Sequence, residues 1–415
     1  MSIIKTRIQA RRAALRAAAM AAAASVVLGA GFANSAEVKI GGLWGLTGPV
    51  AQFIPPMKAA ADLAIKQVNA QGGIGKGDKL SLIMADTKCD GKTSSAAANK
   101  LVNINNVVAI NGALCSGATI GAANTVAIPT GVVMISPAST SPAITSLKDK
   151  DFVFRVTPAD DFQGKILARV IKKRGIGKIA ITYIQNDYGK GLAESLKMNF
   201  EKIGGVVAGY AAHEAKKASY RSELATLKKG GAKHLVVIAY AADSGPVLIR
   251  QSLERGYFAK FIGVDGINND KMFAKIGWKN VQGMFITNSG SIPGTDGEKA
   301  YIAALKAASP SAVGKPFVAN SYDATFMIAL AVEQAGSRDR TKIRDALRKI
   351  AGPGGTVVLP GEWAKAKKLI AAGTKINYQG AAGPHDFDAA GDVPGVIDVF
   401  EIKGNKRVLI EKIAK

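Results

Sequence analysis

Two stretches of this chain each place a hydroxyl-rich turn directly after an apolar run. Residues 107–119 read VVAINGALCSGAT and residues 132–142 read VVMISPASTSP. The apolar runs are typical of buried strands, and each turn opens a segment suited to a helix, with Pro142 at a first helical position. Two helix N-termini lined with hydroxyls favour a small carboxylate, because unpaired N–H groups and the helix dipole both attract an anion. Ser and Thr are also common helix caps, and this simpler interpretation stands beside the anion site.

Short apolar runs alternate with amphipathic segments along most of the chain. The runs typical of buried parallel strands are 38–44, 80–85, 107–112, 132–136, 178–184, 234–240, 260–265 and 283–288. The helical segments are 57–70, 162–174, 189–203, 220–229, 245–255 and 321–335. Gly72-Gly73 is expected to end the first helix. This alternation predicts an α/β fold of open, doubly wound sheets, which bind ligands at the carboxyl ends of their strands.

The first 36 residues have the pattern of a secretory signal peptide. Basic residues without an acidic one precede an alanine-rich apolar stretch and a small-residue cleavage region that ends at Ala36. The Arg11-Arg12 pair leaves the twin-arginine route open beside the general secretory route that we favour. A transmembrane anchor is the alternative, but alanine is only weakly apolar and no stop-transfer flank follows. We therefore expect a soluble mature protein in the periplasm.

The chain has two cysteines, Cys89 and Cys115. In an oxidising compartment they are most simply joined by a disulfide, which contributes about 3 kcal/mol in the chain-entropy model. A metal site is a poor alternative, since His213, His234 and His385 are scattered without ligand spacing. We expect neither a metal nor a cofactor.

The chain is strongly basic, with a formal net charge of +24. Its lysines are spread singly over helix faces, and no aromatic residues alternate with basic ones as a single-strand nucleic-acid platform requires. We therefore expect no nucleic-acid partner, and interpret the charge as a solvated surface that also favours acidic partners.

Motifs that would indicate an enzyme are incomplete. The glycine-rich residues 72–77 follow a helix and lack the Gly-Lys-Ser/Thr ending of a phosphate loop. Residues 386–392 begin like a calcium loop, but the twelfth position is Ile397 instead of glutamate, so we expect a β-turn. The sequence contains no Gly-x-Ser-x-Gly elbow, and no nucleophile stands near a histidine. We predict a protein that is not an enzyme.

Five segments match one protein family, in the order that the family has them. They are GLTGPVAQF (45–53), VNAQGGI (68–74), Cys115-Ser116, ISPASTSP (135–142) and DYGKG (187–191). From about residue 38 to residue 335 the chain resembles the periplasmic leucine/isoleucine/valine-binding proteins, the substrate-binding components of ABC importers. The resemblance implies a type I periplasmic binding protein fold, in which a three-stranded hinge joins two doubly wound, Rossmann-like α/β lobes around a ligand cleft. We place the first lobe at 37–157 and 289–355, and the second at 158–288 and 356–415.

The resemblance also implies roles for residues around the cleft. A ligand carboxylate would be held by the hydroxyl of Ser116, by the backbone of Ala138, Ser139 and Thr140, and by the hydroxyls of the last two. Asp265 falls where the family places an acidic partner for the ligand ammonium. The aromatic positions that flank the ligand correspond to Phe53 and Tyr188, with Tyr240 near another. The cysteine pair resembles the disulfide of the family.

Two positions depart from well-known members of the family. Asp265 is shorter than the glutamate found there, and its alternative role is to cap a helix that starts near Asn269. Trp44 replaces a small residue, and it either lines the cleft or packs in the core, as strand-end tryptophans usually do. The Asp160-Asp161 pair contacts ligand from the hinge or caps a helix, and we favour the cap.

These observations predict a monomeric periplasmic protein that binds a branched-chain or other apolar amino acid and delivers it to an ABC permease. The alternatives are a binding protein for a short amide, urea or aromatic acid, and a ligand sensor of the same fold. The export signal argues against a cytoplasmic regulator, and an exported hydrolase lacks a nucleophile.

Overall fold

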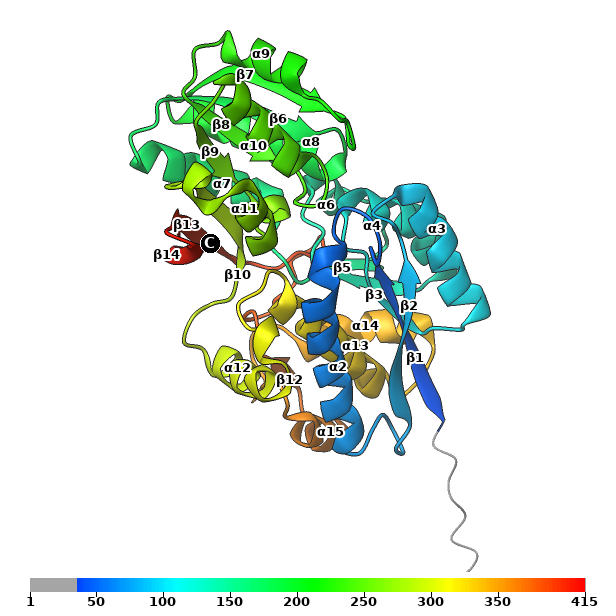
Figure 1. The fold of residues 1–415 in the computed structure, drawn as a ribbon. Helices are drawn as coiled ribbons and strands as arrows, with labels where there is room; N and C mark the ends of the chain where they lie inside the picture. Colours follow the sequence, from blue (N-terminus) through cyan, green and yellow to red (C-terminus); the bar gives the residue numbers. More distant parts are fainter. Residues whose placement is uncertain (1–35, 415) are drawn as a thin grey trace, which may run out of the picture. The chain divides into compact units, whose positions relative to one another are not determined.

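A computed structural model describes residues 36–414, in which helices surround two large β-sheets (Figure 1). The signal peptide expected over residues 1–36 lies outside the described residues, apart from Ala36. Among residues 36–414, no helix is both long and apolar enough to cross a bilayer.

The first lobe is built on a five-stranded parallel sheet with the strand order β2-β1-β3-β4-β5. The strands are β1 (Glu37–Trp44), β2 (Lys79–Asp86), β3 (Ala109–Gly112), β4 (Val133–Ser136) and β5 (Val153–Arg155). This is a doubly wound order, in which the chain turns back to the other side of β1 after β2. The connections that follow β1 and β3 therefore diverge, and they leave a crevice at the carboxyl ends of these two strands.

The second lobe contains a seven-stranded sheet with the order β14-β13-β10-β9-β8-β6-β7. The strands are β6 (Lys178–Ile184), β7 (Val206–His213), β8 (His234–Ile238), β9 (Lys260–Gly263), β10 (Phe285–Gly290), β13 (Val396–Lys403) and β14 (Lys406–Ala414). Its parallel part, β7-β6-β8-β9-β10, repeats the order of the first sheet, so a second crevice lies between β6 and β8. The antiparallel hairpin β13–β14, red in Figure 1, extends the sheet beyond β10.

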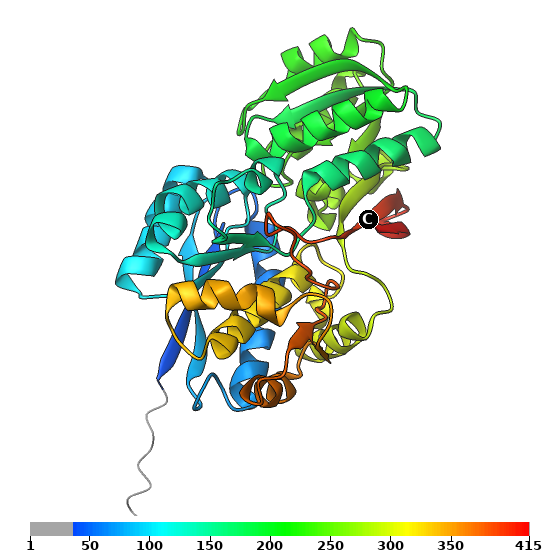
Figure 2. The same cartoon turned by 180° about the vertical axis from the view of Figure 1, so that it is seen from behind.

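Helices cover both sheets. Those of the first lobe are α2 (Ile54–Ala70), α3 (Gly91–Asn99), α4 (Ser116–Ala122), α5 (Ile128–Thr130), α6 (Pro142–Thr145), α12 (Asp296–Ala308), α13 (Val318–Ala335), α14 (Arg340–Ile350) and α15 (Trp363–Ala371). Those of the second lobe are α7 (Asp160–Lys173), α8 (Asp187–Lys202), α9 (Arg221–Lys228), α10 (Ser244–Arg255) and α11 (Asp270–Ile276). The residues of α13 are buried almost all round, because α13 lies between α2 and α14 (Figure 2).

All eight strands and six helices expected from the sequence are present, with shifted ends. The structure adds strands β5 and β7, the short pair β11 (Thr356–Val358) and β12 (Ile376–Tyr378), and the hairpin β13–β14. The apolar runs do not predict β7, because it is an edge strand whose residues are mostly half-buried. α2 ends at Ala70, just before Gly72-Gly73, as expected. Within residues 386–392, Gly391 N donates to Asp388 O at 3.1 Å, which confirms the β-turn.

The chain passes between the lobes three times. The connections are residues 156–159, 291–295 and 379–395, which join β5 to α7, β10 to α12 and β12 to β13. The sequence-based boundaries assign all of residues 356–415 to the second lobe. α15 packs instead on α2 and α13 of the first lobe, which favours a crossing after β12.

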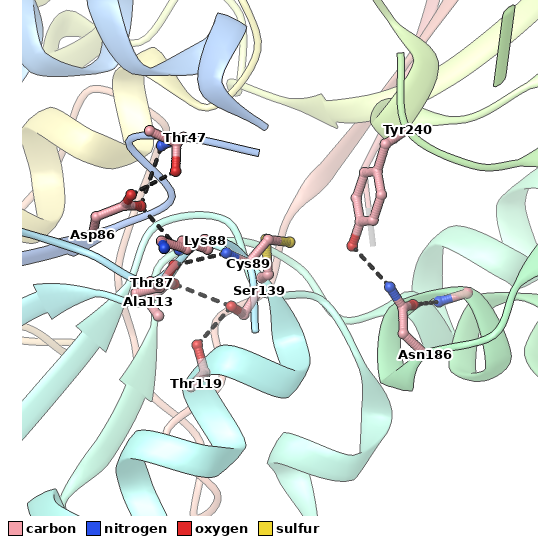
Figure 3. The surroundings of a disulfide bond; sticks show 12 residues. Thr47, Asp86, Thr87, Lys88, Cys89, Ala113, Thr119, Ser139, Asn186 and Tyr240 are labelled. Atoms are coloured by element: carbon pink, nitrogen blue, oxygen red, sulfur yellow. Dashed lines mark hydrogen bonds between the residues drawn. A yellow bond between two sulfur atoms is a disulfide. The ribbon is translucent and has the colours of Figure 1, made fainter. Parts of the chain in front are cut away.

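Cys89 and Cys115 form the predicted disulfide, with their Cα atoms 5.3 Å apart. It ties the loop after β2 to the turn that begins α4, next to the hydroxyls of Thr119 and Ser139 (Figure 3). The bond therefore holds two carboxyl-terminal loops of the first sheet together.

We expect replacement of both cysteines by serine to lower the free energy of unfolding by about 3 kcal/mol, since the unfolded chain loses a cross-link over 26 residues. Urea unfolding of the parent and the double variant measures the difference. As a control for the bond itself, unfolded and unreduced parent protein should show no reactive thiol. Two reactive thiols would contradict the disulfide.

Candidate ligand-binding site

A cavity lies between the carboxyl ends of the two sheets. Its walls are apolar and aromatic, with few polar groups: Val50, Phe53, Met57, Leu114, Cys115, Ser116, Ala138, Tyr188, Tyr240, Asp265, Gly266 and Phe317. Six of the residues proposed from the sequence are in this set. The cavity encloses about 30 Å³, room for about one or two water molecules. Entry of an amino acid therefore requires the lobes or the lining side chains to move apart.

The first lobe contributes hydroxyl groups, and most of them are already paired. Ser139 Oγ lies 2.7 Å from Thr119 Oγ1 and donates to Ala113 O at 3.1 Å (Figure 3). Ser116 Oγ accepts the backbone N–H of Ser141 at 3.2 Å. The hydroxyl of Thr140 is buried and lies beside the Asp160 carboxylate without a well-formed hydrogen bond to it. Thr140 is therefore the candidate hydroxyl for a ligand contact, whereas Ser139 holds the loop in shape.

The anion site expected from two helix N-termini is only partly present. α4 begins at Ser116 as predicted, and π-helical and α-helical turns continue it to Thr130. The segment after Ser141 forms a single turn, α6, whose dipole is small. Ser141 caps that turn by accepting the N–H of Ala143, which is the simpler role that the sequence left open.

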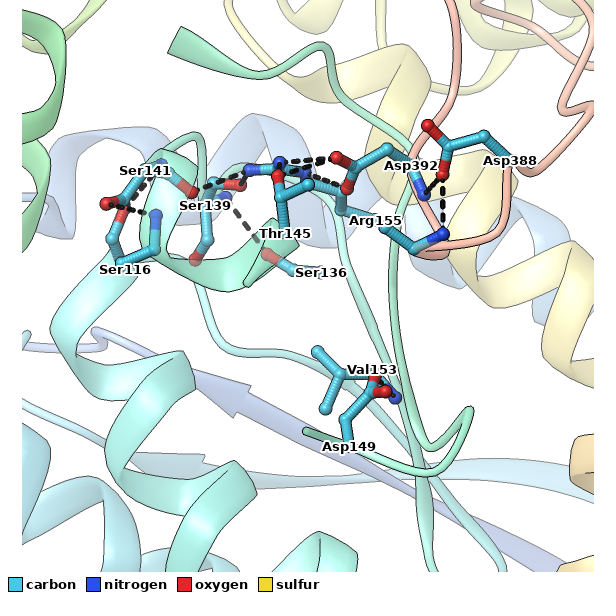
Figure 4. Close-up of polar contacts among 12 residues, drawn as sticks. Ser116, Ser136, Ser139, Ser141, Thr145, Asp149, Val153, Arg155, Asp388 and Asp392 are labelled. Carbon is cyan, nitrogen blue, oxygen red and sulfur yellow. Dashed lines mark hydrogen bonds and ion pairs between the residues drawn. The ribbon is translucent and has the colours of Figure 1, made fainter. Parts of the chain in front are cut away.

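Arg155 fixes the loop that carries Thr140. Its side chain is fully buried, and Nη1 donates to Ser141 O at 2.9 Å and to Ser139 O at 3.5 Å. On its other side the guanidinium holds Asp392, with distances of 2.5 Å from Nε and 2.7 Å from Nη2 (Figure 4). Arg155 therefore joins the hydroxyl loop to the third connection between the lobes.

The second lobe contributes a buried carboxylate to the cavity wall, Asp265, which lies two residues after β9 and is 4% exposed. Its Oδ1 accepts hydrogen bonds from Gln163 Nε2 at 2.8 Å and from the Tyr188 hydroxyl at 3.1 Å. Both donors are neutral, and no Lys or Arg of the described residues pairs with it. Burial raises the pKa of Asp265 to about 6, although the two hydrogen bonds lower it. This carboxylate is therefore suited to a cationic group of a ligand.

The alternative role of Asp265 as a helix cap is excluded by the structure. The side chain of Asn269 caps α11 and accepts the N–H of Met272 at 2.9 Å. The carboxylate of Asp265 instead lies on the wall of the cavity.

Asp160 is a second buried carboxylate beside the site. Asp160 and Asp161 lie in the first turn of α7, where their charge suits the helix N-terminus, but no side-chain hydrogen bond caps this helix. The Thr140 hydroxyl lies beside the Asp160 carboxylate. Burial, and then the charge of Asp265, raise the pKa of Asp160 well above its usual value. A cationic ligand group beside these two carboxylates would relieve both the burial cost and their repulsion.

Aromatic rings form the remaining walls. Tyr188 and Tyr240 stack with their centroids 5.4 Å apart, and Asn186 Nδ2 donates to the Tyr240 hydroxyl at 3.4 Å. From the first lobe, Phe53 meets Phe317 edge to face at 6.2 Å. These rings leave the polar ends of a ligand to the hydroxyl loop and Asp265.

Trp44 does not line the cavity. It is fully buried at the end of β1, and Nε1 donates to Asn111 O at 3.0 Å, on the neighbouring strand β3. Its position favours the packing role over the cleft-lining role.

Comparison with known proteins places the chain in a family. A model of the periplasmic binding protein family matches residues 37–396. The leucine-, isoleucine-, valine-, threonine- and alanine-binding protein of Pseudomonas aeruginosa is 34% identical over 324 residues, which cover 77% of this chain and 85% of that protein. The chain belongs to the periplasmic leucine/isoleucine/valine-binding protein family. The Leu/Ile/Val-binding protein of Escherichia coli K12 is 29% identical over 80% of this chain and 89% of its own length.

Solved structures show the same fold, the type I periplasmic binding protein fold. The leucine-binding protein LivK of Thermotoga maritima superposes with a TM-score of 0.76 at 22% identity, covering 91% of this chain and 98% of that chain. LivJ of Streptococcus pneumoniae, in complex with isoleucine, has a TM-score of 0.74 at 22% identity and covers 92% and 100%. A solute-binding protein of R. palustris in complex with benzoate has a TM-score of 0.73 at 17% identity and covers 91% and 96%.

Several residues of this family member's site were not found from the sequence. The sequence contains one indication for Gln163, because it is a polar residue on the apolar face of an amphipathic helix. Leu114 and Met57 look like ordinary core residues in the sequence. Phe317 comes from the returning part of the first lobe, 264 residues after Phe53, so no local pattern joins the two rings.

Proposed function

We propose that this protein is the periplasmic substrate-binding component of an ABC importer and carries a zwitterionic amino acid with an apolar side chain. The observation that supports this most is that one lobe offers an acceptor for a cation and the other offers donors for an anion. The buried carboxylate of Asp265 lies on the second lobe, and the Ser116 and Thr140 hydroxyls belong to the first. An α-ammonium and an α-carboxylate would meet these two groups respectively.

The walls between these groups favour a branched aliphatic side chain. Val50, Met57, Leu114 and the phenylalanine rings offer no hydrogen-bond donor to a polar side chain. Two relatives are named as binding proteins for leucine, isoleucine and valine, and one of them also for threonine and alanine. These names support the same ligand class.

An aromatic acid is the second candidate, because structures of the same fold hold benzoate and 4-hydroxybenzoate. Tyr188 and Tyr240 would suit an aromatic ring. Asp265 argues against it, because a ligand without an ammonium would leave this buried carboxylate unpaired.

Titration calorimetry on residues 37–415 tests the proposal. The ligands are leucine, isoleucine, valine, threonine, alanine and benzoate. 4-Methylpentanoate and isoamylamine serve as matched controls, since each lacks one charged group of leucine. We expect leucine, isoleucine or valine to bind most tightly and both controls to bind at least about tenfold more weakly. Tighter binding of benzoate than of any amino acid would contradict the proposal.

The localisation, the partner and the oligomeric state follow from the same proposal. The family is periplasmic, and the leader expected over residues 1–36 agrees with export. We propose an ABC permease as the partner and a monomer as the working form.

We expect Thr140→Val to weaken amino-acid binding by about 1.5–3 kcal/mol, because the ligand carboxylate loses a donor while the side-chain shape is kept. Calorimetry measures the loss. Thr125→Val, which removes an exposed hydroxyl that donates to Gly121 O within the same lobe, is the control and should keep the affinity. Unchanged binding by Thr140→Val would place the anion site elsewhere.

We expect amino-acid affinity to fall as the pH drops below about 6. The raised pKa of Asp265 means that the free protein holds a proton there at low pH. An ammonium needs the ionised carboxylate, so binding must expel this proton, and at pH 5 the affinity should be about tenfold lower than at pH 7. Calorimetry across this range measures the change. The Asp265→Asn variant should lose most of the pH dependence.

A further inference from the structure

The second sheet has a basic groove at the edge opposite the ligand cavity. Parallel strands bring their starting residues to one edge, and here β6, β8, β9 and β10 are neighbours. Lys178 and Lys260 are the first residues of β6 and β9, and Lys233 precedes β8. The lysines, which appear singly in the sequence, therefore meet in one row.

The row borders a groove of about 610 Å³. None of the residues that line the groove is acidic. Besides the three lysines, Arg174 and His234, they are glycines and apolar or neutral residues. The full lining is Arg174, Gly175, Ile176, Gly177, Lys178, Gly231, Lys233, His234, Lys260, Phe261, Gln282, Gly283, Met284 and Phe285. A Cβ added at Gly175, Gly177, Gly231 or Gly283 would meet nothing within 4 Å, so the groove is open along the three loops that lead into β6, β8 and β10.

The charges in this groove are poorly compensated. Arg174 pairs with Glu401 at 2.8 Å and packs over Phe285. Within residues 36–414, the side chains of Lys178, Lys233 and Lys260 make neither a hydrogen bond nor an ion pair. His234 pairs with Ile179 on one side and with Lys260 on the other, so Lys178 and Lys233 lie side by side, one residue earlier, on strands about 4.8 Å apart. Like charges this close repel one another. Burial and the charges of Lys260 and Lys233 lower the pKa of His234, which agrees with a positive potential.

We propose that this groove binds phosphate groups that present two or more negative charges to Lys178, Lys233 and Lys260. Phosphate oxygens are strong acceptors for lysine ammonium groups, and a multiply charged anion relieves the repulsion along the row. The site is independent of the amino-acid cavity, which lies at the carboxyl ends of the same strands. A soluble polyphosphate and a phospholipid headgroup share this chemistry.

Three probes distinguish the sources: inorganic tripolyphosphate in calorimetry, phosphatidylcholine vesicles, and the same vesicles with phosphatidylglycerol in co-sedimentation. The variant is Lys178→Gln, Lys233→Gln and Lys260→Gln together. The control carries Lys165→Gln, Lys202→Gln and Lys275→Gln, which remove equal charge from exposed positions on helices of the same lobe. Amino-acid binding by both triple variants checks that they are folded.

Binding of tripolyphosphate that weakens by at least about tenfold in the groove variant and by less than about twofold in the control supports a soluble phosphate ligand. The same contrast with phosphatidylglycerol vesicles alone supports a membrane surface. Equal losses in both triple variants, or no binding of either probe at low ionic strength, would overturn the proposal, since net charge alone then accounts for the results.

Discussion

Replacing Asp265 by asparagine is expected to weaken binding of the preferred amino acid by at least about tenfold, ~1.4 kcal/mol. Asparagine keeps the size and can still accept from Gln163 and Tyr188, but it removes the charge that an ammonium needs. A buried ammonium without a charged acceptor is costly, because the protein interior solvates it poorly.

The same substitution should leave the melting temperature of the ligand-free protein unchanged or slightly higher. An acid whose folded-state pKa is raised binds its proton more tightly when folded, so its ionisation above pH 6 costs stability, and asparagine has no such cost. Glu201→Gln is the control, since it removes one charge from an exposed position near the other end of α8. Unaltered affinity in Asp265→Asn would exclude the ammonium role and favour a ligand without an amine.

Replacing Arg155 by methionine is expected to lower the free energy of unfolding by about 3–5 kcal/mol, the usual effect of breaking a buried ion pair. The variant leaves the Asp392 carboxylate without its cation and the carbonyls of Ser139 and Ser141 without their donor. Figure 4 shows these partners on both sides of the guanidinium.

Urea unfolding measures the loss, and two variants show its cause. Adding Asp392→Asn to Arg155→Met removes the unpaired charge and should recover part of the stability. Arg221→Met breaks an ion pair with Glu254 in which both side chains are more than two-fifths exposed, so its effect should stay below about 1 kcal/mol. If Arg155→Met lowered the free energy of unfolding as little as Arg221→Met does, the ion pair between Arg155 and Asp392 would not be a major contributor to stability.

Local patterns in the sequence were sufficient for eight of the parallel strands and for the strand-end positions of several site residues. Buried parallel strands are continuous apolar runs, and the residues that follow them lie at the carboxyl edge whatever the rest of the chain does. Ser116 and Tyr188 follow such runs, and Tyr240 and Asp265 stand at the ends of two of them, so the local pattern places all four near the carboxyl edge. Their roles toward a ligand came from the resemblance to the family.

The tertiary structure decided what depends on contacts between distant segments. Arg155 meets Asp392 across 237 residues, and Phe317 returns to Phe53 from the other end of the first lobe. Trp44 is a core residue because β3 offers its indole a carbonyl acceptor. Single lysines became a row only where parallel strands aligned their starts. The positions of strand ends can be predicted from local runs of apolar residues. The contacts between distant residues depend instead on how the sheets and their connections pack, and no local pattern in the sequence describes that packing.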